Sequence, residues 1–145
     1  MIKLSKLSDY AIVVLSRLAT EQGELQTASS LSEGTGIPEP TVAKVLKLLS
    51  RSGIIQSIRG VKGGYLFNRS PSDITITELI EALEGPVAIT SCADEELESN
   101  CAMSGLCPIH GRWVPVNKAI KSALDQVFLA DLLISKRPSI RRAGL

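Results

Sequence analysis

Apolar and polar positions alternate with a helical period in the first part of the chain. The segment SDYAIVVLSRLATE carries a broad apolar face after Ser8, a residue type that caps helix N-termini, and its pattern ends near Glu21. Thr27 precedes a second, shorter segment, ASSLSEGTG, which stops at Gly34 and Gly36. The pattern predicts one long and one short helix, each begun by a hydroxyl cap.

A third helix is predicted in PTVAKVLKLLSRSG. Pro40 suits its first position, where the missing amide would be unpaired in any case, and Gly53 closes the segment. Apolar residues recur there with a spacing of 3.6, at Val42, Val45, Leu46 and Leu49. The remaining positions place a polar and basic group on other faces, namely Thr41, Lys44, Lys47 and Arg51. Two helices joined by a tight glycine-containing turn are typical of a helix-turn-helix, and an ordinary helical hairpin is the alternative.

The segment IIQSIRGVKGGYLFN predicts a β-hairpin. Residues 54–58 and 65–67 form its strands, and the glycine-rich turn RGVKGG places Arg59 and Lys62 at the tip. When the hairpin is taken alone, a solvated hairpin tip is the better explanation of these charges, because exposed charges are common there. After a basic third helix, however, the hairpin indicates a wing, with the helix in the DNA major groove and the wing beside it.

The second half of the chain begins with another predicted helix. Thr75 and Glu78 have the spacing of a capping box before ITELIEALEG, and Gly85 ends that segment. After a stretch without sustained periodicity, an apolar stripe runs from Trp113 through Val116, Ile120, Leu124 and Val127. This amphipathic helix requires a partner surface, which is either a two-fold mate or the core of its own chain.

Composition and charge narrow the class of protein. The 145 residues are 44% hydrophobic, enough for a core, and no stretch approaches the roughly 20 apolar residues of a membrane span. The N-terminus lacks the layout of a signal peptide, so we expect a cytoplasmic protein without a membrane partner. Residues 1–70 carry nine Lys or Arg against five acidic residues, and 71–100 carry eight acidic residues and no basic ones. The basic excess in the first part favours a polyanionic partner.

All three cysteines, Cys92, Cys101 and Cys107, and the single histidine, His110, fall in the aperiodic stretch. In a reducing compartment such a cluster favours a metal or redox site over disulfides, and thiolates are soft ligands suited to an iron–sulfur cluster. Three thiolates leave one ligand position open. A structural zinc site of three cysteines and one histidine would use the same atoms. A cysteine enzyme is not expected, because no motif orients Cys107 and His110 as a nucleophile and base.

Several motifs together resemble one bacterial family. KLSDYAIVVLSRLA, RGVKGGY, ITITELIEALEGP and three cysteines followed by Trp113 occur here in the order found in the winged-helix regulators IscR, NsrR and RirA. The resemblance runs from Met1 to about Leu133 and looks closest to the regulators of the SUF iron–sulfur assembly system. An interaction adaptor that had lost DNA binding would lack the basic residues of the third helix and wing, which are present.

The resemblance implies a homodimer that binds a double-stranded DNA operator and represses iron–sulfur cluster assembly genes. It also implies a cluster, 2Fe–2S favoured and 4Fe–4S as the alternative, held by Cys92, Cys101 and Cys107. His110 follows Cys107 with C-x-x-H spacing and is preferred as the fourth ligand over Asp9, which lies where some relatives supply a carboxylate from the other subunit. The interval between Cys92 and Cys101 is longer than in IscR. A winged regulator of other genes, responsive to nitric oxide, redox state or iron, is the alternative function.

The expected fold is mainly α. It combines a winged helix-turn-helix with a two-stranded wing, a cysteine-bearing loop and a long dimerisation helix. The predicted boundaries are 1–86 for the DNA-binding domain, 87–111 for the cluster-binding loop, 112–134 for the dimerisation helix region and 135–145 for a flexible basic tail.

Overall fold

The structure is a computed structural model that describes residues 3–93 and 101–133. Over these ranges the chain is mainly helical with one two-stranded antiparallel sheet, as the sequence predicts. The elements in chain order are α1 (Lys6–Thr20), α2 (Ala28–Thr35), α3 (Glu39–Arg51), β1 (Ile55–Ile58), β2 (Gly64–Phe67), the 3-10 turn η1 (Pro71–Asp73), α4 (Ile76–Glu84), the 3-10 turn η2 (Ser91–Ala93), α5 (Val114–Asp125) and α6 (Leu129–Leu133).

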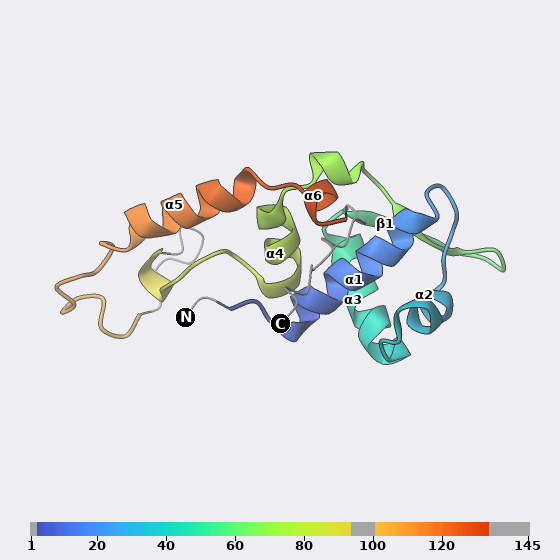
Figure 1. Cartoon of the computed structure of the whole chain (residues 1–145). Coiled ribbons are helices and arrows are strands. Elements are labelled where there is room, and N and C mark those ends of the chain that lie inside the picture. Colours follow the sequence, from blue (N-terminus) through green and yellow to red (C-terminus); the bar gives the residue numbers. More distant parts are fainter. Residues whose placement is uncertain (1–2, 94–100, 134–145) are drawn as a thin grey trace, which may run out of the picture.

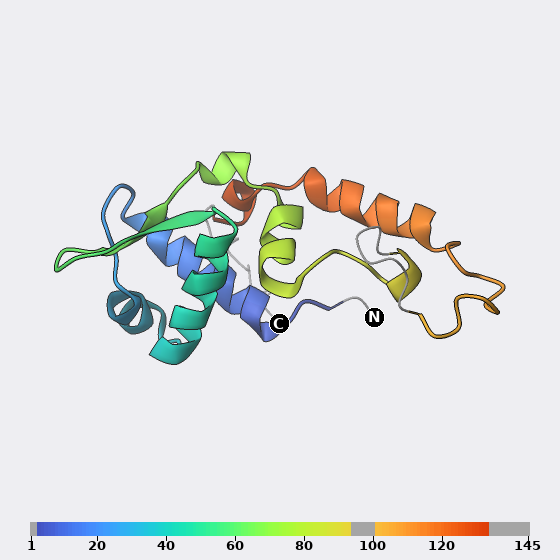
Figure 2. The same ribbon diagram turned by 180° about the vertical axis from the view of Figure 1, so that it is seen from behind.

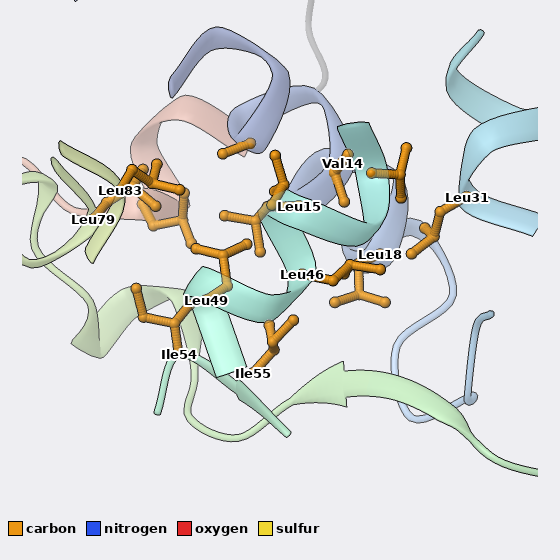
Figure 3. Packing of buried hydrophobic residues seen from close by; sticks show 14 of the residues in the cluster. Val14, Leu15, Leu18, Leu31, Leu46, Leu49, Ile54, Ile55, Leu79 and Leu83 are labelled. Atoms are coloured by element: carbon orange, nitrogen blue, oxygen red, sulfur yellow. The ribbon is translucent and has the colours of Figure 1, made fainter. Parts of the chain in front are cut away.

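The first three helices enclose the core of the molecule. Leu15 of α1 and Leu46 and Leu49 of α3 are fully buried and lie together in Figure 3, with Leu31 of α2 at one side and Leu79 of α4 at the other. Burying a leucine or isoleucine side chain contributes about 1.5–3 kcal/mol relative to leaving it in water. The apolar core therefore fixes α3, including the side chains on its outer face, against α1.

Two predicted helix starts differ from the structure. The N-cap of α1 is Ser5, whose hydroxyl accepts a hydrogen bond from the backbone N–H of Ser8, so the prediction that Ser8 caps this helix is wrong. Helix α3 begins at Glu39, which places Pro40 in its second position instead of its first. Thr27 caps α2 as predicted, and its hydroxyl accepts from the N–H of Ser30.

The hairpin β1–β2 is held at its base by a third piece of chain. The two strands pair from Ile55 opposite Phe67 to Ile58 opposite Gly64, close to the predicted limits. Gln26 pairs with Tyr65 through two backbone hydrogen bonds of 3.1 and 2.8 Å. The hairpin then projects beyond the helices at one end of the molecule (Figure 1). The tip is thus extended while the base is fixed to the segment between α1 and α2.

Helix α4 connects the first three helices and the hairpin to the rest of the chain. Its predicted capping box is confirmed, because Thr75 accepts from the N–H of Glu78 while the Glu78 carboxylate accepts from the N–H of Thr75. Gly85 has a φ of +89°, a backbone conformation that favours glycine, and the chain turns there toward η2. The capping box fixes where α4 starts, and the glycine fixes where it ends.

Helix α5 leaves the compact part of the molecule and the chain then returns to it. Figures 1 and 2 show α5 extending away from α4, with the loop that precedes it at the opposite end from the hairpin. The helix ends at Asp125, shorter than a stripe reaching Val127 predicts. The N–H of Leu129 donates to the carbonyl of Ile74 at 2.8 Å, and Leu129 joins the core. Within the range 112–134, α5 therefore projects while α6 packs on α1 and η1.

No helix in the described part of the chain is both long and apolar enough to cross a membrane. The predicted tail 135–145 lies outside the described residues.

Candidate nucleic-acid interface and metal site

The outer face of α3 carries the basic residues that the sequence assigns to the DNA groove. Its buried side is made of Val42, Val45, Leu46 and Leu49, as the apolar spacing predicts. Lys44, Lys47 and Arg51 are exposed, and Thr41 is partly exposed. Because the apolar face is anchored in the core, the basic face is presented on a rigid helix.

The tip of the hairpin presents two more cations. Arg59 and Lys62 are exposed on either side of Val61, which is also fully exposed. Two glycines make the turn sterically feasible. A Cβ atom at position 63 would collide with the Ile58 carbonyl oxygen, and one at Gly64 would stand 2.9 Å from the Gln26 carbonyl oxygen. The wing tip is therefore a thin, cationic projection, a shape suited to the DNA backbone or minor groove.

Cys92 lies in η2, at the end of the molecule away from the wing. Its thiol lies 3.4 Å from the Thr90 hydroxyl. The hydrogen bond with the Thr90 hydroxyl, followed by one from the backbone N–H of Gly111, holds the pKa of the Cys92 thiol below its ordinary value. Hydrogen bonds that favour the thiolate favour metal ligation as well, since the thiolate is the ligand form.

Cys101, Cys107 and His110 lie on consecutive turns between residues 101 and 113. The N–H of His110 donates to the carbonyl of Cys107 at 3.2 Å, and the N–H of Ser104 donates to that of Cys101 at 2.9 Å. The thiols of Cys101 and Cys107 are not in disulfides and are partly exposed. The turns that carry these residues and η2, which carries Cys92, lie at the same end of the molecule (Figures 1 and 2).

The candidate donors do not form a closed metal site. Among the residues that the structure describes, no three His, Cys, Asp or Glu side chains lie close enough together to hold a metal ion. Asp9 is exposed in the first turn of α1. The chemistry of the donors fits a soft metal, and ligation by all three thiols requires the turns of 101–113 to move toward Cys92.

Sequence analysis missed a residue that supports this region. Asn117 of α5 is buried, and its amide hydrogen-bonds the segment that carries Cys92. One signal was available: Asn117 stands four residues after Trp113 and three before Ile120, so it shares the face of the apolar stripe. A polar side chain on such a face requires hydrogen-bond partners, but the sequence does not say which.

The helix-turn-helix, the wing and the cysteine-bearing end define a winged-helix transcription regulator. A family model, Rrf2, described as iron-dependent transcriptional regulator, matches residues 4–135, and the chain belongs to this family. The family resemblance predicted from the motifs is confirmed; the closer relation to SUF regulators stays a prediction.

Relatives along most of the chain are regulators as well. NsrR of Bacillus subtilis is 31% identical over 135 residues, which is 92% of this chain and 92% of NsrR. CymR of the same organism is 28% identical over 131 residues, 90% of this chain and 88% of CymR. The structure of CymR, called the global cysteine regulator of that bacterium, has a TM-score of 0.66 at 26% identity and covers 92% of this chain and 97% of its own.

IscR of T. potens has a similar fold. Its structure gives a TM-score of 0.62 at 28% identity and covers 91% of this chain and 86% of IscR. The winged-helix fold class is thereby confirmed. The protein is a DNA-binding transcription regulator and not an enzyme, as the sequence predicts.

Proposed function

We propose that this regulator binds a palindromic double-stranded DNA operator as a homodimer and changes its affinity through an iron–sulfur cluster. Its target genes would be those of iron–sulfur cluster assembly, including the SUF system, which it would repress. One observation carries the sensing part of the proposal: η2, which holds Cys92, and the turns that hold Cys101, Cys107 and His110 lie at the same end of the molecule.

DNA reading is assigned to two exposed basic surfaces. Lys44, Lys47 and Arg51, together with Thr41, would enter the major groove on α3, where phosphate contacts position the helix and base-edge contacts specify the sequence. Arg59 and Lys62 would contact the backbone or minor groove beside it. Both surfaces are cationic and exposed, and one core holds α3 and the hairpin, which supports their joint role in binding DNA.

The proposed dimer interface lies on α5 and the turns before it. Apolar side chains remain exposed along this region at Met103, Leu106, Ile109, Trp113 and Val116. Leu106 has 84% of its surface in solvent and Val116 has 43%. An apolar surface on a helix that projects from the body needs a cover, and a two-fold copy supplies one of identical chemistry.

Three thiolates would hold the cluster: Cys92, whose thiol pKa is lowered by the hydrogen bonds from Thr90 and Gly111, with Cys101 and Cys107. When bound, such a cluster supplies redox- and ligand-sensitive iron to the regulator. We favour a 2Fe–2S cluster over a 4Fe–4S cluster. The chain's own part is to present thiolates and to close 101–113 over them.

His110 is the proposed fourth ligand. It follows Cys107 by three residues. Asp9 is the alternative. The family resemblance implies that this carboxylate would come from the partner subunit.

The deciding experiment combines metal analysis with DNA binding. Protein purified without oxygen should be coloured, contain iron and acid-labile sulfide, and bind operator DNA with an affinity that changes when the cluster is removed. A colourless protein with one zinc per chain would instead support the structural zinc site. A cluster that forms while assembly-gene operators go unbound would assign the regulator to other genes responsive to nitric oxide, redox state or iron.

The fourth ligand is tested by substitution. His110→Ala should alter the visible absorption and resonance Raman spectra, because imidazole donates less charge to iron than thiolate does. Asp9→Ala should leave both spectra unchanged, and Cys107→Ala should abolish the cluster. If Asp9→Ala changes the spectra and His110→Ala does not, the ligand is the carboxylate.

A further inference from the structure

Asn117 is buried on a helix whose apolar neighbours are exposed. Its exposed fraction is 7%, whereas that of Val116, the preceding residue, is 43%. It is the buried residue of α5 within the described chain. Burial of a carboxamide is unfavourable unless its oxygen and nitrogen are hydrogen-bonded. The position of Asn117 therefore depends on partners outside its own helix.

Those partners are three backbone groups between Val87 and Ala93, in the segment that follows α4 and ends with η2. The Oδ1 atom of Asn117 accepts from the N–H of Ile89 at 3.1 Å. Its Nδ2 atom donates to the carbonyl of Val87 at 2.9 Å and to that of Ala93 at 3.4 Å. Three of the four hydrogen bonds that a carboxamide can make are thus directed at one short segment.

Cys92 lies inside the span that this amide holds. Ile89 is three residues before Cys92 and Ala93 is one residue after it, so the segment is fixed on both sides of the thiol. The held segment also contains Thr90, whose hydroxyl lies 3.4 Å from the Cys92 thiol. The backbone of η2 has little other support from regular structure, since its 3-10 turn spans only Ser91–Ala93.

We infer that Asn117 is a positioning residue for Cys92, which fixes the thiol on α5 so that a change in ligation at Cys92 is passed to that helix. This inference rests on the proposed function, in which Cys92 is a cluster ligand. Helix α5 is in turn joined to α4, because the Lys121 ammonium contacts the Glu81 carboxylate at 2.9 Å and the Thr77 hydroxyl donates to the Lys121 carbonyl at 3.4 Å. Movement of Cys92 would thus reach the DNA-binding half through two contacting helices.

Asparagine supplies both the acceptor and the donor that these three backbone groups require. Alanine would leave the N–H of Ile89 and the carbonyls of Val87 and Ala93 without these partners. Aspartate would keep the acceptor for the Ile89 N–H but would direct negative oxygen at the Val87 and Ala93 carbonyls. Asn117→Ala therefore removes all three hydrogen bonds, whereas Asn117→Asp removes only the two that Nδ2 donates.

Amide hydrogen exchange on the full-length protein tests the contact itself. In Asn117→Ala, exchange at the Ile89 amide should rise by about tenfold or more, while amides in α3 keep their protection. In Asn117→Asp the rise at Ile89 should be smaller. Ser122→Ala, an exposed polar residue on the same helix, is the matched control and should change nothing. An unchanged Ile89 amide in Asn117→Ala overturns the inference.

A double-mutant comparison tests whether Asn117 acts through Cys92. After anaerobic reconstitution with ferrous iron and sulfide, Asn117→Ala should shift the iron–sulfur Raman bands in the otherwise unchanged protein and cause no further shift in a Cys92→Ser background. Equal shifts in both backgrounds would make Asn117 a general structural residue and overturn the inference. If the unsubstituted protein takes up no cluster, the proposed function fails, and the exchange measurement alone decides the role of Asn117.

Discussion

Ser8 donates a hydrogen bond through its hydroxyl to the carboxylate of Glu84, which ties the first turn of α1 to the last residue of α4. Ser5 reaches the same carboxylate oxygen from its backbone N–H at 3.0 Å and from its hydroxyl at 2.7 Å. These bonds, the one from Ser8 first and those from Ser5 next, lower the pKa of Glu84. Glu84, which precedes the turn at Gly85 toward η2, thus also fixes the start of α1.

Glu84→Gln should destabilise the protein at neutral pH and cease to matter in acid. A pKa lowered in the folded state means that the carboxylate stabilises the fold above its unfolded pKa of about 4.3. That contribution is lost as the pH falls through the folded pKa. The difference at pH 7 should be below about 1 kcal/mol because Glu84 is exposed. Urea unfolding at pH 7 and at successively lower pH measures it.

Glu33→Gln on α2 is the control for this measurement, since Glu33 is an exposed acid far from the α1–α4 contact in the fold. A stability difference between the original protein and Glu84→Gln that stayed constant down to pH 3 would contradict the assignment.

The start of α1 also shows where sequence reasoning stops. Ser5 and Ser8 are both hydroxyl residues three positions apart, and either could cap the helix by local pattern alone. Which of the two serines caps the helix depends on Glu84, which is 76 residues from Ser8 in the chain. Local features were predicted correctly where they are self-contained, as in the capping box of Thr75 and Glu78.

Gly64→Ala should loosen the wing. A Cβ atom at this position would stand 2.9 Å from the Gln26 carbonyl oxygen, and because the nearest atoms are all backbone atoms of Gln26, they have little room to move. We expect a loss of stability of about 2 kcal/mol, within the range of clashes in packed sites. Thermal unfolding checks the prediction. Gly105→Ala is the matched control, because a Cβ there meets nothing within 4 Å and should leave the melting temperature unchanged.

Arg59→Ala should weaken operator binding without changing the fold, because Arg59 is exposed at the hairpin tip. Loss of a phosphate contact should reduce the slope of log affinity against log salt by about 1, and loss of a base contact should cost about 1–3 kcal/mol at one position. Fluorescence anisotropy with a duplex of half-sites about 10 base pairs apart measures both.

Lys118→Ala, which removes one positive charge from α5 instead of the wing, is the control for the DNA titration. Equal losses for the two variants would mean that net charge, and not the wing, determines affinity.

Val116→Glu should separate the proposed dimer. Val116 is exposed on α5 beside Trp113, and a carboxylate there would be buried against its own copy across a two-fold axis. Sedimentation equilibrium should show a monomer, and operator affinity should fall accordingly. Ser122→Glu places the same charge on another face of α5 and should remain dimeric. A monomeric unsubstituted protein would refute the interface.

The candidate metal site was predicted only as a set of residue types. The cysteine count and the spacing of His110 from Cys107 are local facts of the sequence, and they indicated the candidate donors. How η2 lies relative to the turns of 101–113 depends on an aperiodic stretch, where no period specifies which residues meet. For the same reason, nothing in the sequence paired Asn117 with the backbone around Cys92.

The wing and the cysteine-bearing turns stand at opposite ends of the protomer, with α4 and α5 between them. Substitutions in the turns therefore leave the DNA-reading surface chemically untouched, and substitutions in α3 leave the thiols untouched. Under the proposed function, evolution could change the signal that the cysteine-bearing turns sense and the promoter that α3 and the wing bind in separate steps. Chimeras joined near Gly85 would likewise exchange the proposed sensing region while keeping the proposed DNA-binding surface.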